Sequence, residues 1–219
     1  ESLMKRLCAI LIIALFVVLS CTQKQPEPEK TMLFNGEDFT GWKLFVPGDT
    51  VDVSDVWSVK EGVVHCTGVP NGYMMTEQSY SNYKLHLEWR WVEEATNSGV
   101  LLHCQGPDQV WPNCLECQLK AGNAGDFVLI GPGQITVDDS VYVNEDRFLV
   151  IEKKHDSNEK PIGEWNTYDI EVRGGSVACY VNGLMQNNGV DYSHTSGPIA
   201  LQSEGSPIEF RNIYITALE

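Results

Sequence analysis

The stretch Tyr83–Trp91, "YKLHLEWRW", alternates apolar and polar side chains along its whole length. In an extended chain the apolar members share one side: Leu85, Leu87, Trp89 and Trp91. The polar members share the other side: His86, Glu88 and Arg90. Alternation with a period of two residues predicts a β-strand with one buried and one polar face.

Further short runs of the same kind follow along the chain, separated by Gly, Pro, Asn and Asp. They are "GVLLHCQ" (99–105), "LECQLK" (115–120), "YDIEVRGG" (168–175), "SVACYVNG" (176–183), "PIALQS" (198–203) and "IEFRNIYITAL" (208–218). The pair Asn182-Gly183 is typical of a tight hairpin turn. Since no long apolar run has helical spacing, we expect an all-β domain of two packed antiparallel sheets, a sandwich or jelly roll.

The first residues resemble a bacterial lipoprotein signal. Lys5 and Arg6 precede an apolar run that ends in Val18-Leu19-Ser20-Cys21, which is similar to a lipobox. We therefore expect a signal peptide at 1–20, lipidation of Cys21, a polar tether at 21–31 and a single β-sandwich catalytic domain at 32–219. This organisation implies a secreted, lipid-anchored protein that is periplasmic or on the cell surface.

The net charge limits the partners of the protein. Fifteen Lys and Arg residues against thirty Asp and Glu residues give a formal charge of -15. Such a charge disfavours binding to nucleic acid or to anionic lipid headgroups, so membrane contact is expected through the lipid anchor only. Neutral or cationic partners fit better.

The spacing Cys114-x-x-Cys117 looks like a metal knuckle or a redox dithiol. If residues 114–120 form a strand, however, the two sulfurs point to opposite faces and cannot share one zinc ion. A redox dithiol would also need a helix after a strand, which the pattern does not supply. The informative residues are therefore Glu116 and Gln118, which share a face with Cys114.

Two predicted strands thus carry carboxylates on their polar faces, Glu88 beside Arg90 and Glu116 beside Gln118. We expect both faces to line one hollow, where two acids, an amide and a guanidinium can hold a sugar. The alternative is that both faces are simply solvated.

The segments 105–113 and 131–163 are expected to be long irregular loops that carry specificity. Trp111 in the first of them is a candidate stacking surface for a sugar ring, or else an anchor for its loop. Tyr73, after Pro-Asn-Gly, is a similar candidate. The acidic segment 138–146 is either a metal site or a solvated loop.

Several segments, taken in order, resemble the 3-keto-disaccharide hydrolase family over residues 32–218. They are "LFNGEDFTGWK" (33–43), "WSVKEGVVHCTG" (57–68), "YMMTEQSYSNYKLHLEWRW" (73–91), "NSGVLLH" (97–103), "LECQL" (115–119), "GEWNTYDIEVRGGSVACYVNG" (163–183) and "GPIALQSEGSPIEFRNIYI" (197–215). The resemblance implies a concanavalin A-like lectin/glucanase sandwich. It also implies cleavage of glycosides with a ketone at carbon 3, and a partner oxidoreductase that makes the ketone. His103 departs from the family, which often has Arg there, and so does the Cys114-Leu115 pair before Glu116.

Such a reaction needs a base, an acid and a positive group at the enolate oxygen. We expect Glu116 to act as base or metal ligand, with Glu88 as its partner. Arg90 or His103 is expected to stabilise the oxyanion. His155 is expected to act as the acid. The substrate-binding candidates are Asn97, Gln118, Trp111, Tyr73 and Gln202. No cofactor is required by the pattern, and a divalent metal at the enolate oxygen is an alternative to a protein cation.

Two other functions fit the same pattern. A lipid-anchored, lectin-like glycan-binding module would bind sugars without releasing a product. An ordinary two-carboxylate glycosidase fits less well, because "EWRWVEE" (88–94) lacks the Asp of the acid triplet that retaining glucanases of this architecture carry.

Overall fold

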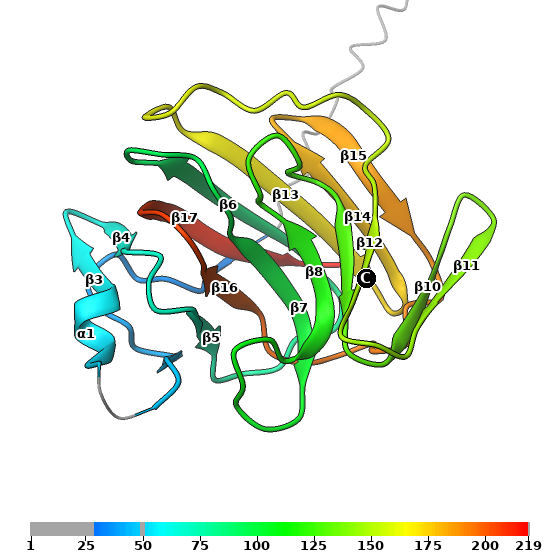
Figure 1. The fold of residues 1–219 in the computed structure, drawn as a ribbon, viewed down its shortest axis with the longest axis horizontal. Coiled ribbons are helices and arrows are strands. Elements are labelled where there is room, and N and C mark those ends of the chain that lie inside the picture. The colour runs from blue at the N-terminus through cyan, green and yellow to red at the C-terminus, as the bar shows by residue number, and fades with distance from the viewer. Residues whose placement is uncertain (1–28, 49–50, 219) are drawn as a thin grey trace, which may run out of the picture.

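The computed structural model describes residues 29–48 and 51–218, which form two antiparallel sheets packed face to face. Figure 1 shows β7 and β8 in front of the other sheet, with the β10–β11 hairpin at one end of the molecule and α1 at the other. This architecture confirms the expected all-β sandwich.

The first sheet has eight strands. Its order is β15 (Leu184–Gly189), β14 (Ser176–Val181), β13 (Asn166–Arg173), β6 (Tyr83–Trp91), β17 (Ile208–Ala217), β4 (Val63–Cys66) and β3 (Trp57–Lys60), and β1 (Lys30–Met32) also pairs with β17. Strand β1 includes Lys30 and Thr31, which lie before the expected domain boundary at 32.

The second sheet has seven strands. Its order is β12 (Phe148–Ile151), β9 (Phe127–Ile130), β8 (Asn113–Gln118), β7 (Gly99–Gln105), β16 (Ala200–Ser203), β5 (Gly72–Thr76) and β2 (Trp42–Phe45). A separate hairpin joins β10 (Gly133–Val137) to β11 (Ser140–Asn144), and α1 (Val53–Val56) is a single turn capped by the Asp52 side chain. Residues 131–163 therefore contain three strands, which corrects the expectation of a long irregular loop.

The alternating stretch that predicted the fold becomes β6, at the centre of the first sheet. It pairs with β13 on one side and β17 on the other, so its backbone polar groups are paired on both edges. Its apolar side chains Leu85, Leu87 and Trp89 have no exposed surface. Removing these side chains from water against the second sheet stabilises the fold.

The turn between β14 and β15 uses the predicted residues. Asn182 and Gly183 have φ angles of 48° and 81°, and Val181 pairs with Leu184. Positive φ at both central positions is the two-residue hairpin geometry that Asn-Gly favours.

The second sheet has an inner and an outer face, and β8 shows the division clearly. Leu115 and Cys117 belong to the main core between the sheets, whereas Cys114 belongs to a smaller apolar cluster on the other side. The two cysteines of the Cys-x-x-Cys spacing therefore point to opposite faces, as predicted. Glu116 and Gln118 share the outer face with Cys114.

The predicted signal peptide, Cys21 and most of the tether lie outside the described residues. Within 29–48 and 51–218, no helix is long and apolar enough to cross a membrane.

Candidate active site

A hollow of about 280 Å³ opens on the outer face of the second sheet. Strand β8 supplies Glu116 and Gln118, and the wall is completed by Asn97, Trp111, Val128, Phe148, Val150 and Glu204. Four of the predicted site residues therefore meet in one place: Asn97, Trp111, Glu116 and Gln118.

Glu116 is the chemically distinctive group of this hollow. Only 5% of its surface is exposed, and no hydrogen-bond partner reaches its Oε1 atom. Burial and, to a smaller extent, the negative charge of nearby Glu204 together raise the pKa of Glu116 to about 8. Near neutral pH this carboxyl group holds its proton, yet it can release that proton under mild conditions.

The opposite strand makes room for this side chain. Gly99 lies on the adjacent strand β7, and a Cβ atom placed there would come within 2.2 Å of Glu116 Oε1. The neighbouring β16 continues the same face. Leu201 pairs with Val100, and both belong to the core, so the next residue, Gln202, points to the outer face.

Unpartnered polar atoms gather around Glu116. On this face of the sheet, side-chain oxygens of Asn97, Glu116, Gln118 and Gln202 are buried without a hydrogen-bond partner, and the Gln202 amide nitrogen also has none. Buried polar groups are ordinarily paired, so a cluster of unpaired ones marks a place where a polar ligand is accepted. Gln202 does not line the hollow itself, although it lies on the same face.

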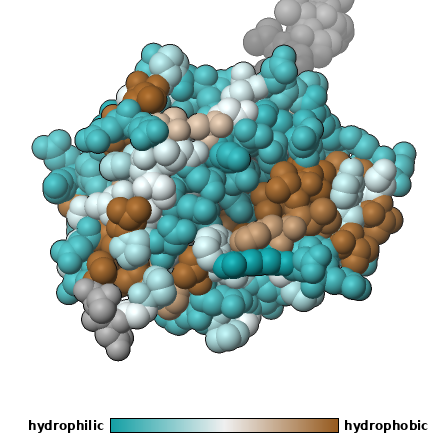
Figure 2. Space-filling view, in the orientation of Figure 1, coloured by the Kyte–Doolittle hydropathy of each residue, from teal (hydrophilic) through white to brown (hydrophobic). Residues whose placement is uncertain are grey.

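The other wall of the hollow is apolar and aromatic. Phe148 meets the Trp111 ring edge-on, with the ring centroids 5.8 Å apart, and Val128 and Val150 pair across neighbouring strands. Figure 2 shows hydrophobic surface gathered around β12 and the β10–β11 hairpin. A hollow with acids and amides on one side and aromatic rings on the other suits a sugar, which has polar edges and apolar ring faces.

The loop that carries Trp111 is fixed to the sheet through Asp108. Tyr73 on β5 donates a hydrogen bond of 2.8 Å to Asp108 Oδ1, and Lys43 on β2 forms an ion pair with the same carboxylate. Tyr73 itself has no exposed surface and stacks on Phe45. The expectation that Tyr73 touches the substrate is therefore wrong, because its hydroxyl is used to hold the loop.

Glu88 and Arg90 lie on the far side of the molecule, which overturns their predicted roles. They point outward from the first sheet, whereas Glu116 points outward from the second, and the core lies between. Glu88 accepts hydrogen bonds from Arg211 and Asn212, and these lower its pKa although partial burial opposes the shift. Arg90 is bonded to Glu209 at 2.5 Å.

His103 does not lie beside Glu116, where the sequence prediction placed it. The pairing of β7 with β8 shifts register after Leu102, and His103 has a φ of 54°. This bulge turns its ring away from the hollow, against Tyr83 and Tyr192, where Nδ1 lies 2.7 Å from the His194 carbonyl. Burial lowers the pKa of His103, so it remains a neutral interior group and not an oxyanion cation.

His155 lines a different hollow of about 410 Å³, with Asp126, Glu152 and Lys153. It is exposed there and does not meet Glu116, so the prediction that it is the acid of the same site is wrong. The carboxylate of this hollow that the prediction missed is that of Glu204, which follows β16 and forms a β-bridge with Asn97. Its position in the quoted segment "LQSEGSP", just past an alternating strand, was the available signal.

Within the described part of the chain, no three His, Cys, Asp or Glu side chains gather closely enough to hold a metal ion. The hollow offers two carboxylates, from Glu116 and Glu204, and the amide oxygens of Asn97 and Gln118. Oxygen ligands of this kind suit a hard cation only if the substrate adds further ligands.

Known proteins similar to this chain carry the same architecture. A Parabacteroides distasonis protein, solved as a candidate glycosyl hydrolase, superposes with a TM-score of 0.64 at 26% identity, covering 87% of this chain and 94% of that one. The Bacillus licheniformis β-glucanase superposes with a TM-score of 0.57 at 11% identity, covering 89% of this chain and 100% of its own. The latter identity establishes the fold alone, a glucanase-type β-sandwich.

Sequence similarity points to one family. A 3-keto-disaccharide hydrolase of Bacteroides thetaiotaomicron is 24% identical over 179 residues, which cover 73% of this chain and 57% of the relative. The chain thus spans little more than half of that protein. The family model of 3-keto-alpha-glucoside-1,2-lyase-like domains matches residues 29–216. Because this match takes in all of the sandwich except its last residues, the chain belongs to the 3-keto-alpha-glucoside-1,2-lyase-like family.

Proposed function

We propose that the protein cleaves glycosides whose sugar carries a ketone at carbon 3, with Glu116 and Glu204 as its proton-transferring pair. The observation that carries the proposal is Glu116, a buried carboxyl group with a pKa of about 8 beside the charge of Glu204. A carboxyl group whose pKa is raised by its surroundings can donate a proton near neutral pH, and a second carboxylate beside it can accept one.

The ketone makes the hydrogen on carbon 2 acidic, so a carboxylate can remove it. In this scheme Glu204 takes that proton, and the electron pair forms an enolate. The enolate then expels the aglycone from carbon 1, and the departing oxygen takes the proton of Glu116. Water adds across the new double bond with its oxygen at carbon 1, while Glu204, whose proton has by then exchanged with solvent, delivers a proton to carbon 2. One hydrogen of the water stays in the new hydroxyl group at carbon 1, and the other protonates the Glu116 carboxylate.

The amide N–H groups of Asn97 and Gln118 serve as donors to the enolate oxygen, and their unpartnered amide oxygens accept hydrogen bonds from sugar hydroxyls. Hydrogen-bond donors aimed at developing charge in a water-poor hollow are an effective source of rate acceleration. The Trp111 and Phe148 rings offer apolar surface to the opposite face of the sugar.

The test is incubation of the protein with a 3-keto disaccharide and with its parent sugar in deuterium oxide. Release of the aglycone from the keto sugar alone, with one deuterium at carbon 2 of the product, is the expected result. An enzyme-free sample controls for spontaneous exchange, and a chelator-treated sample reports whether a cation assists. Cleavage of the parent sugar, or a product without deuterium, contradicts the scheme. Saturable binding without a product supports the lectin-like alternative.

We also propose that the protein is exported and anchored through a lipid on Cys21, and that it acts after an oxidoreductase that makes the 3-keto sugar. The support for the anchor is the sequence at 18–21. Metabolic labelling with a radioactive fatty acid tests it, since Cys21→Ser should abolish incorporation. Label retained in this variant excludes Cys21 as the site.

A further inference from the structure

A second hollow lies beside the proposed catalytic hollow on the same face of the second sheet. Its volume is about 450 Å³, within the usual range for ligand pockets of about 300–1,000 Å³. It is lined by Gln109, Val110, Trp111, Asn113, Ile130, Gly131, Pro132 and Arg147.

The two hollows are neighbours along the strands. Trp111 lines both of them. Val128, in the catalytic hollow, and Ile130, in the second one, lie two residues apart on β9 and belong to the same apolar cluster. Two residues of a strand span about 7 Å, so one ligand of two linked rings can occupy both hollows.

The charges of the two hollows are opposite. Glu116 and Glu204 are acidic groups of the first, whereas Arg147 is the one charged residue among those lining the second. The guanidinium of Arg147 lies 4.3 Å from the centre of the Trp111 ring and 5.1 Å from that of Phe148. Among the described residues it forms no ion pair with a carboxylate, although the protein carries twice as many acidic as basic residues.

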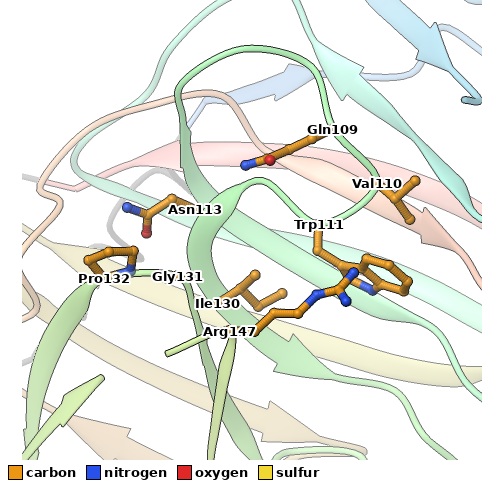
Figure 3. A pocket seen from close by; sticks show the side chains of 8 residues that line it. All are labelled: Gln109, Val110, Trp111, Asn113, Ile130, Gly131, Pro132 and Arg147. Carbon is orange, nitrogen blue, oxygen red and sulfur yellow. The ribbon is translucent and has the colours of Figure 1, made fainter. Parts of the chain in front are cut away.

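Stacking on an aromatic ring leaves the edge of a guanidinium free for other contacts. That edge carries a fork of N–H donors, which matches the two oxygens of a carboxylate. Figure 3 shows the Arg147 guanidinium against the Trp111 indole, with the amide groups of Gln109 and Asn113 farther around the same hollow. These amides offer further polar contacts to an occupant.

We infer that the second hollow is the subsite for the leaving group, and that it selects a leaving group bearing a carboxylate. The inference rests on the proposed function for the identity of the first hollow. An acidic leaving group is attracted by Arg147 and repelled by the negative charge of Glu204. The charge difference therefore fixes which end of the substrate enters the catalytic hollow.

The test compares two 3-keto-glucosides, in both anomers, whose phenol leaving groups carry either a carboxylate or a carboxamide opposite the oxygen. The two phenols differ in their intrinsic reactivity as leaving groups. The readout is therefore the ratio of kcat/KM for the carboxylate substrate to kcat/KM for the carboxamide substrate, compared between protein variants. This ratio should fall about tenfold from wild type to Arg147→Gln, and added salt should weaken the wild-type preference. Arg173→Gln, which removes the same charge from the other sheet, should keep the wild-type ratio.

A binding measurement separates this inference from the proposed function. Calorimetry with free 4-hydroxybenzoate and 4-hydroxybenzamide requires no turnover, and wild type should bind the acid about tenfold more tightly. Arg147→Gln should lose this preference. If neither keto-glucoside is cleaved, the proposed function fails, while the binding result still decides the subsite. Any of three results overturns the inference: wild type binds the two ligands equally, wild type shows no detectable binding of the acid, or Arg147→Gln keeps the preference for the acid.

Discussion

Gly99 lies against the carboxyl group of Glu116 on the adjacent strand, so that a Cβ atom at Gly99 would come within 2.2 Å of Glu116 Oε1. No atom pair tolerates this separation without movement of the side chain. The conformation of the proposed acid therefore depends on the absence of a side chain one strand away.

Gly99→Ala should accordingly displace Glu116 and lower kcat/KM on a 3-keto glycoside by at least about a hundredfold, since misplaced catalytic groups cost rates of this order. Steady-state kinetics measure the loss, and circular dichroism checks that the sandwich still forms. Wild-type turnover in a folded variant would show that the observed position of Glu116 is not needed.

Glu116→Gln keeps the size of the side chain but cannot transfer a proton. We expect a loss of about 10²–10⁴-fold in kcat, the usual contribution of a general acid or base. Glu88→Gln is the matched control, because Glu88 lies on the opposite outer face, bonded to Arg211 and Asn212. A comparable loss in both variants would mean that the damage is structural.

The raised pKa of Glu116 makes stability depend on pH. Its pKa is about 8 in the folded protein against 4.5 as an ordinary value. Between these values the folded protein holds the proton and the unfolded chain releases it, so rising pH favours unfolding. At about 1.4 kcal/mol per pKa unit, the loss in unfolding free energy from pH 5 to 8 is on the order of a few kcal/mol.

Urea unfolding at several pH values measures this loss. In Glu116→Gln, the unfolding free energy should fall less as the pH rises. In Glu204→Gln, its fall should end at a lower pH, because the neighbouring negative charge no longer raises the pKa of Glu116. If the unfolding free energy changed with pH in the same way in wild type and both variants, this result would contradict the assigned pKa shift.

Tyr73→Phe should loosen the loop at 105–113 without unfolding the protein. The substitution removes the hydrogen bond to Asp108 but leaves the ion pair between Lys43 and Asp108. We expect a stability loss of about 1 kcal/mol and a higher KM, because Trp111 on this loop lines both hollows. Hydrogen exchange of the loop amides measures the loosening, and unchanged exchange with unchanged KM would exclude this anchoring role.

The pattern of apolar and polar residues was enough to predict the fold class and the faces of individual strands. Alternation in residues 83–91 predicted one apolar face, and this face forms part of the core. The same rule separated Cys114 from Cys117, and the Asn182-Gly183 pair predicted its hairpin. These features are local: they depend on the period of a strand and on the φ angles that a turn requires.

Which polar faces lie together depends on how distant strands pack. Glu88 and Glu116 both point outward from a sheet, but a sandwich has two outer faces, and alternation does not assign a strand to one sheet or the other. The local sequence pattern also did not predict the bulge at His103 or the burial of Tyr73, because both follow from packing between distant segments. Glu204 lines the same hollow as Glu116 because only β7 separates β16 from β8 in the sheet, although the two strands are far apart in the chain.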